Sequence, residues 1–149
     1  MLLVVIIIGV TAALAVPRYS RSFAFMKLRS AAYDVAATVE HAQALAVLEE
    51  RRVLLNVSGS RTSCWLSSES GGDDRPFKPV TCDLPEGITI DSITFDDSLL
   101  AHKDYVTFRP DGEPDRCAIT LVNRAREAFQ VYVEPGLGHT RVVRMEGKT

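Results

Sequence analysis

The sequence predicts an α+β fold in which one long N-terminal helix carries a small, largely antiparallel β-sheet head. Three observations predict this fold. An apolar stretch without any charged residue opens the chain, apolar residues then recur at helical steps to about Glu50, and beyond Arg52 the apolar period changes to two. The 149 residues suffice for one ordinary domain. We therefore expect a hydrophobic transmembrane or filament-core segment over residues 1–22 and a head over residues 23–149, so that half of the helix is an anchor and half packs on the head.

The composition is that of a globular protein and indicates neither an enzyme nor a nucleic-acid-binding protein. Hydrophobic residues make up 46% of the chain and charged residues 24%, which argues against disorder. The net charge of −2 supplies no bulk attraction for nucleic acid. The 3 histidines are scattered, and no serine or cysteine lies in a recognisable nucleophile motif. We therefore expect a non-enzymatic protein with no cofactor and no metal, and we do not expect nucleic acid as a partner.

The opening segment is apolar on every face of a helix, so lipid or protein must surround it. A helix over residues 1–16 is about 24 Å long, slightly short of the roughly 30 Å hydrocarbon core of a bilayer. Three interpretations stay open: a secretory signal cleaved after Ala15 that releases a plain β-domain, a simple anchor, and a segment whose true N-terminus lies upstream behind a basic leader. The residues that we assign to this membrane or filament helix are Leu2, Leu3, Val4, Val5, Ile6, Ile7, Ile8, Gly9, Leu14 and Pro17.

The second part of the helix is amphipathic. Pro17 predicts a kink in the helix and not its end. Beyond it, apolar residues recur at steps of three and four, while Lys27, Asp34 and Glu40 take other angles around the helix. The apolar stripe, which can pack on a sheet, consists of Leu28, Ala32, Val35, Val39, Ala42 and Ala46.

Short β-strands separated by turn residues follow the helix. We predict strands at 53–57, 62–66, 80–82, 88–95, 105–109, 118–123, 129–134 and 140–145. Residues 67–76 are rich in Ser, Gly and Asp, and they predict an exposed, mobile loop. Strands that follow one another so closely predict an antiparallel meander laid on the helix.

Two groups of residues in the head are candidates for a disulfide bond and for a metal site. A disulfide between Cys64 and Cys82 would stabilise the fold by roughly 3 kcal/mol in the chain-entropy model. Pairings with Cys117 and unpaired thiols stay open as alternatives. The carboxylates of residues 111–115 are of the kind that calcium binds, but a solvated turn needs the same residues, and we favour the turn.

Four arginines near the C-terminus form a candidate DNA patch: Arg124, Arg126, Arg141 and Arg144. Together with Lys148 they could converge on one edge of the sheet and contact phosphates. Glu127, Glu134 and Glu146 are interleaved with them and would weaken the field. We therefore favour a solvated strand face over a DNA site.

The first 20 residues or so closely resemble the N-terminal helix of type IV pilins and type II secretion pseudopilins. The resemblance is carried by Met1-Leu-Leu-Val-Val-Ile-Ile-Ile-Gly9 and by Ala12-Ala-Leu-Ala-Val-Pro-Arg-Tyr19. In that family a basic leader ending in Gly precedes a mature start of the form Phe-Thr-Leu-Ile/Leu-Glu. Aligning Gly9 and Pro17 with the family's Gly and Pro places Met1 just after that Glu. Residues 42–52, 106–112 and 131–143 are similar to the H-type minor pseudopilins and the fimbrial protein T group.

The resemblance implies a minor pseudopilin, most similar to the H type, in the pseudopilus of a type II secretion system that exports proteins. It also implies cleavage and methylation by a prepilin peptidase, one pass through the bacterial inner membrane, and a head in the periplasm. Expected partners are other pseudopilins, the inner-membrane assembly platform, and the secretin or exported proteins. The alternative is a type IV pilus minor pilin of the fimbrial protein T kind, in pilus biogenesis or DNA uptake.

Overall fold

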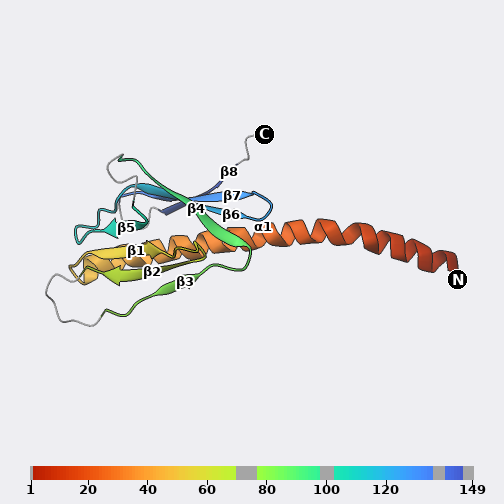
Figure 1. The fold of residues 1–149 in the computed structure, drawn as a ribbon, viewed down its shortest axis with the longest axis horizontal. Helices are drawn as coiled ribbons and strands as arrows, with labels where there is room; N and C mark the ends of the chain where they lie inside the picture. Colours follow the sequence, from red (N-terminus) through yellow and green to blue (C-terminus); the bar gives the residue numbers. More distant parts are fainter. Residues whose placement is uncertain (1, 70–76, 98–102, 136–139, 146–149) are drawn as a thin grey trace.

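One helix and eight strands form the part of the chain that the structure describes (Figure 1). The computed structural model describes residues 2–69, 77–97, 103–135 and 140–145, and between residues 2 and 21 it describes side chains at positions 4 and 7 only. After α1 (Leu2–Leu48) the strands are β1 (Val53–Val57), β2 (Ser63–Ser68), β3 (Thr81–Asp83), β4 (Ile88–Phe95), β5 (Tyr105–Phe108), β6 (Cys117–Asn123), β7 (Ala128–Val133) and β8 (Thr140–Met145). The predicted α+β fold is confirmed. The first and last residues of each predicted strand differ by at most two positions from those of the observed strand.

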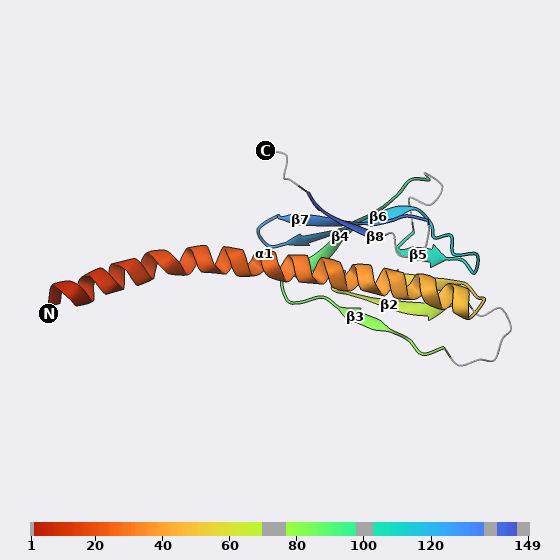
Figure 2. The same cartoon turned by 180° about the vertical axis from the view of Figure 1, so that it is seen from behind.

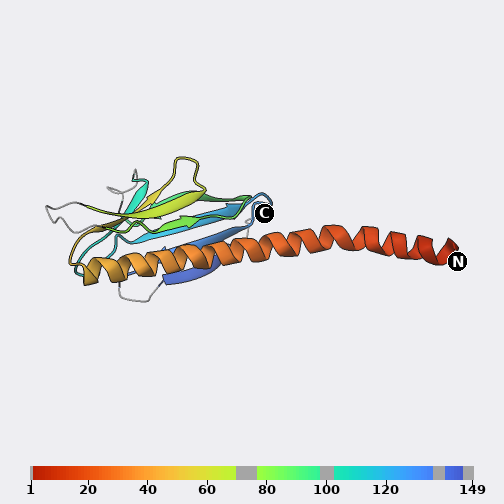
Figure 3. The ribbon, with the colours of Figure 1, turned by 90° about the horizontal axis from the view of Figure 1, so that it is seen from below.

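Helix α1 runs the length of the head and continues well beyond it, as Figure 3 shows. It passes through position 17 without interruption, so the proline does not end it, as predicted. In Figures 1 and 2 the part outside the head curves gradually. Within the part of the chain that the structure describes, no helix is both long and apolar enough to span a membrane.

The C-terminal end of α1 is closed by backbone hydrogen bonds typical of a Schellman motif. The Arg51 amide donates to the Ala46 carbonyl at 3.3 Å, and the Glu50 amide donates to the Val47 carbonyl at 3.4 Å. Glu50 has a φ of 52°, in the left-handed region where glycine is usual. The helix therefore ends sharply, and the chain turns straight into β1.

The strands form two antiparallel sheets of four. The first sheet has the order β3-β2-β1-β5, and the second has the order β4-β6-β7-β8. The order expected of one meander is therefore wrong: β4 leaves the first sheet for the second, and β5 returns to pair with β1. The buried Val106 and Phe108 of β5 complete the first sheet's inner face.

The two sheets are joined at the β1–β2 turn. The Ile90 amide of β4 donates to the Arg61 carbonyl at 2.9 Å, and the Arg61 side chain donates to the carbonyl of Asp91. At this point the pairing of β4 with β6 shifts by one residue between Ile90 and Ser92. The irregularity lets β4 bond to β6 on one side and to the turn of the first sheet on the other.

A single core lies between α1 and the inner faces of both sheets. All six residues of the predicted stripe, from Leu28 to Ala46, are 0% exposed. Facing them are Leu55, Leu66 and Val106 from the first sheet and Ile119, Leu121 and Val131 from the second. The stripe prediction is confirmed, and it explains how one helix holds two sheets together.

Candidate assembly surface

The outward face of α1 beside the head carries large apolar side chains. Phe23 is 59% exposed, Met26 65% and Tyr33 51%. Met26 and Tyr33 are seven residues apart and therefore lie on one face, opposite the buried stripe. The amino group of Lys27 lies 5.9 Å from the Phe23 ring centre, and the guanidinium of Arg29 lies 5.7 Å from that of Tyr33. Sequence reasoning missed this face, although the seven-residue spacing was a readable signal.

The same apolar character continues into the half of α1 outside the head. Val4 is 55% exposed and Ile7 is 54% exposed. An isolated helix that displays such residues in water is unfavourable, because each exposed apolar side chain loses the gain of burial. The outer face of α1 is therefore suited to contact with lipid or with other helices.

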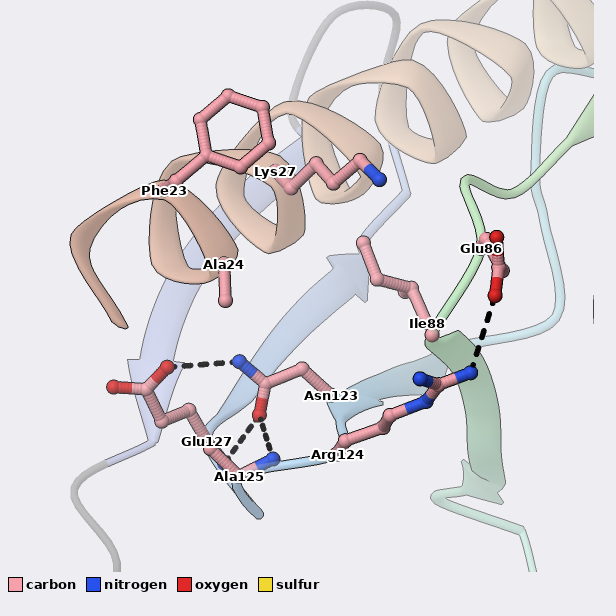
Figure 4. A pocket seen from close by; sticks show the side chains of 10 residues that line it. Phe23, Ala24, Lys27, Glu86, Ile88, Asn123, Arg124, Ala125 and Glu127 are labelled. Atoms are coloured by element: carbon pink, nitrogen blue, oxygen red, sulfur yellow. Dashed lines mark hydrogen bonds and ion pairs between the residues drawn. The ribbon is translucent and has the colours of Figure 1, made fainter. Parts of the chain in front are cut away.

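An open groove of about 690 Å³ lies where α1 leaves the head (Figure 4). It is lined by Phe23, Ala24 and Lys27 of α1, by residues 86–88 before and in β4, and by residues 123–125 and 127 at the β6–β7 turn. In Figure 4, Ala24 points from the helix towards the turn that holds Asn123 and Glu127. The groove is thus shaped jointly by the helix and by the second sheet.

Asn123 organises the β6–β7 turn beside this groove. Its side-chain oxygen accepts hydrogen bonds from the Ala125 and Glu127 amides, each at 3.0 Å. Its side-chain nitrogen donates to the Glu127 carboxylate at 2.8 Å. Across the groove, Arg124 and Glu86 form an ion pair at 3.3 Å that is largely exposed to solvent. Groups of both charge signs therefore line the groove, which suits contact with another polar protein surface.

The four arginines of the candidate DNA patch are spread over the second sheet. Arg124 and Arg126 share the β6–β7 turn, and the guanidinium of Arg144 lies 4.7 Å from the Phe25 ring centre on the helix side. Arg141 is three residues from Arg144 on β8, so the two side chains point to opposite faces. Lys148 lies outside the described residues. The structure thus brings two of the four together, and DNA binding stays a prediction.

The acidic loop at residues 111–115 forms a turn. The Glu113 amide donates to the Asp111 carboxylate at 2.9 Å. Asp115 is 4% exposed and pairs with Arg109 at 3.3 Å, so its charge is already compensated. Among the described residues, no group of three or more His, Cys, Asp and Glu side chains could hold a metal ion.

The three cysteines are free thiols, and two of them are direct neighbours. Cys64 of β2 and Cys82 of β3 are opposite each other in the register of the first sheet, and Cys117 lies in β6. The hydrogen bond between the two neighbouring thiols raises the pKa of Cys64, as does burial, and it lowers the pKa of Cys82 to about 7. Burial raises the pKa of Cys117 to about 12. Disulfide pairing of Cys64 with Cys82 stays a prediction.

Comparison with known proteins assigns the fold. No family model matches the sequence, and no curated protein matches it. Among solved structures, the minor pseudopilin EpsH of the Vibrio cholerae type II secretion system is similar with a TM-score of 0.56 and 12% identity, over 82% of this chain and 97% of that one. The type IV minor pilin FimU of Pseudomonas aeruginosa is similar with a TM-score of 0.55 and 13% identity, over 80% and 88%. The pilin-like fold is confirmed.

Proposed function

We propose that the chain is a non-enzymatic structural subunit of an extracytoplasmic filament, specifically a minor pseudopilin of the H type in a type II secretion system. The observation that carries this proposal is the continuation of α1 beyond the head with exposed apolar residues. A helix of this kind needs partners outside its own chain. The fold shared with EpsH, which is described as a minor pseudopilin of that system, agrees with the proposal.

In this proposal the apolar half of α1 lies in the inner membrane before assembly and then packs among the helices of neighbouring subunits. Exchanging lipid for apolar helices costs little, because both environments remove the same side chains from water. The head stays in the periplasm, where the outward face with Phe23, Met26 and Tyr33 and the groove at the base of the head meet other pseudopilins. The assembly platform, and the secretin or exported proteins, complete the set of proposed partners. Cleavage and methylation by a prepilin peptidase belong to the same proposal.

A minor pilin of a type IV pilus is the second candidate. The similarity to FimU, with a TM-score of 0.55 against 0.56 for EpsH, supports it equally well at the level of the fold. DNA uptake as its task would need a basic surface. The ion pair of Arg124 and the stacking of Arg144 on Phe25 occupy two of the candidate arginines. Pilus biogenesis is therefore the better supported form of this alternative.

A deletion of the gene in its own bacterium separates the two candidates. We expect type II-dependent proteins to disappear from the medium while surface pili and DNA uptake stay normal. The full gene restores export. The Val4→Asp variant should restore it at least about tenfold less, because a carboxylate inside hydrocarbon costs about 3 kcal/mol, whereas the matched Val4→Leu variant should restore it fully.

The opposite outcome is equally clear. Loss of pili with normal export would show that the chain is a minor pilin of a type IV pilus and not a pseudopilin. Normal export, pili and DNA uptake after deletion, or full activity of Val4→Asp, would contradict a filament subunit altogether.

A further inference from the structure

The cysteine pair at the edge of the first sheet is placed for chemistry that filament assembly does not use. Cys64 and Cys82 are cross-strand partners, and the backbone bonds on either side, from Leu66 to Val80 and from Leu84 to Thr62, are each 2.8 Å long. Directly opposite residues of this kind have Cα atoms about 5.5 Å apart, inside the range of about 4.4–6.8 Å that a disulfide needs. The strands thus already hold the two residues at bonding separation.

The two thiols differ in access to solvent. Cys64 lies in the middle of the sheet and is 1% exposed, whereas Cys82 is half-buried on β3, a strand of three residues at the sheet edge. An external reagent can therefore approach Cys82 along the edge but cannot reach Cys64 in the folded head. This difference fixes an order of reaction, with Cys82 first and Cys64 second.

The two thiols also differ in protonation. The Cys64 thiol donates a hydrogen bond to the Cys82 sulfur, and this bond, together with one from Thr38, lowers the pKa of Cys82 to about 7. Burial and the carboxylates Asp34 on α1 and Asp83 on β3 oppose this shift. The bond between the two thiols raises the pKa of Cys64. The thiolate is the attacking species in exchange with disulfides. At neutral pH the attacking sulfur is thus the accessible one.

We propose that Cys82 and Cys64 form a thiol–disulfide exchange site that accepts low-molecular-weight disulfides such as oxidised glutathione. The Cys82 thiolate attacks one sulfur of the glutathione disulfide, forms a mixed disulfide and releases one glutathione thiolate. Cys64 then attacks the Cys82 sulfur, which forms the Cys64–Cys82 bond, and the Cys64 proton passes to the departing sulfur of the second glutathione. Two protein thiols are oxidised by two electrons, and one disulfide is reduced to two thiols.

The bond would fasten the edge strand β3 to β2. Within the described residues β3 pairs with β2 alone and spans only three residues, so its attachment to the sheet is weak. A disulfide closes the chain between positions 64 and 82 and limits local opening there. The site therefore couples the redox state of the surroundings to the order of one edge of the head, independently of the proposed function.

The test uses the reduced full chain in detergent micelles with oxidised glutathione as the probe. Intact mass and non-reducing peptide mapping should show loss of two hydrogens and one linked peptide pair, Cys64 with Cys82, while Cys117 stays free. The Cys64→Ala variant should instead accumulate one stable glutathione adduct at Cys82. The Cys82→Ser variant should take up no glutathione, and Cys117→Ser should behave like the parent chain.

A measurement without any variant guards against loss of folding. Iodoacetamide should alkylate Cys82 at least about tenfold faster than Cys117, with a rate that rises through a midpoint near pH 7 for Cys82. Equal rates for Cys82 and Cys117, glutathione attached first to Cys64 or Cys117, or an oxidised chain without the Cys64–Cys82 link would overturn the exchange site. None of these results bears on export or pilus formation, so failure of this site is distinguishable from failure of the proposed function.

Discussion

The two halves of α1 have the same backbone geometry and opposite surroundings. In the half beside the head, the stripe from Leu28 to Ala46 is 0% exposed, whereas outside the head Val4 and Ile7 expose more than half of their surface. The half beside the head buries one apolar face against the two sheets, and its outward face, with Met26 and Tyr33, is left for contacts outside the chain. The half outside the head, which comes first in the sequence, is apolar on all faces, because its partners must come from outside the chain. The difference teaches that the residue pattern of a helix reports which side its partner lies on, and not only that it is a helix.

The largest change in the free energy of unfolding is expected when a side chain of the buried stripe is truncated. Leu28→Ala should lower the free energy of unfolding of the head by about 2–5 kcal/mol, because a fully buried leucine leaves a cavity. Urea unfolding in micelles, followed by the fluorescence of Trp65, the chain's single tryptophan, measures the change. An effect below about 1 kcal/mol would mean that the stripe does not hold the head to the helix.

A smaller change in the free energy of unfolding, of opposite sign, is expected at the C-terminal end of α1. Glu50→Gly should raise the free energy of unfolding by about 0.5–1 kcal/mol, because glycine adopts the left-handed conformation at this position without steric cost. Glu40→Gly is the matched control: it lies exposed inside the helix and should cost about 1 kcal/mol. The same urea titration measures both, and equal signs for the two substitutions would refute the assignment of the helix end.

The smallest effect on stability is expected on the outward face of α1. Met26→Ser replaces a side chain that is 65% exposed, so the unfolding free energy should change by less than about 0.5 kcal/mol. Crosslinking of the variant to neighbouring subunits in cells should nevertheless fall if this face meets them. Unchanged crosslinking would restrict the contacts between subunits to the apolar half of the helix.

Much of the fold was readable because its signals are local. The periodicity of the stripe from Leu28 to Ala46 lies within one helix, and each strand is indicated by alternating apolar and polar residues over a short stretch of sequence. The assembly surface was readable only in part. Leu2 to Pro17 were identified as a helix that needs external partners, but Phe23, Met26 and Tyr33 were missed because the expected face was the buried one. The groove at the base of the head joins residues 24 and 124, a separation that no local pattern spans.

The sequence by itself determined that a long helix, apolar on all sides at first and on one side later, precedes a set of short antiparallel strands. Only the tertiary structure decided that the strands divide into two sheets, that β5 returns to pair with β1, and that Cys64 faces Cys82. The physical reason is that alternation tells each strand which face to bury, whereas the choice of neighbour depends on how all inner faces fit together over one helix.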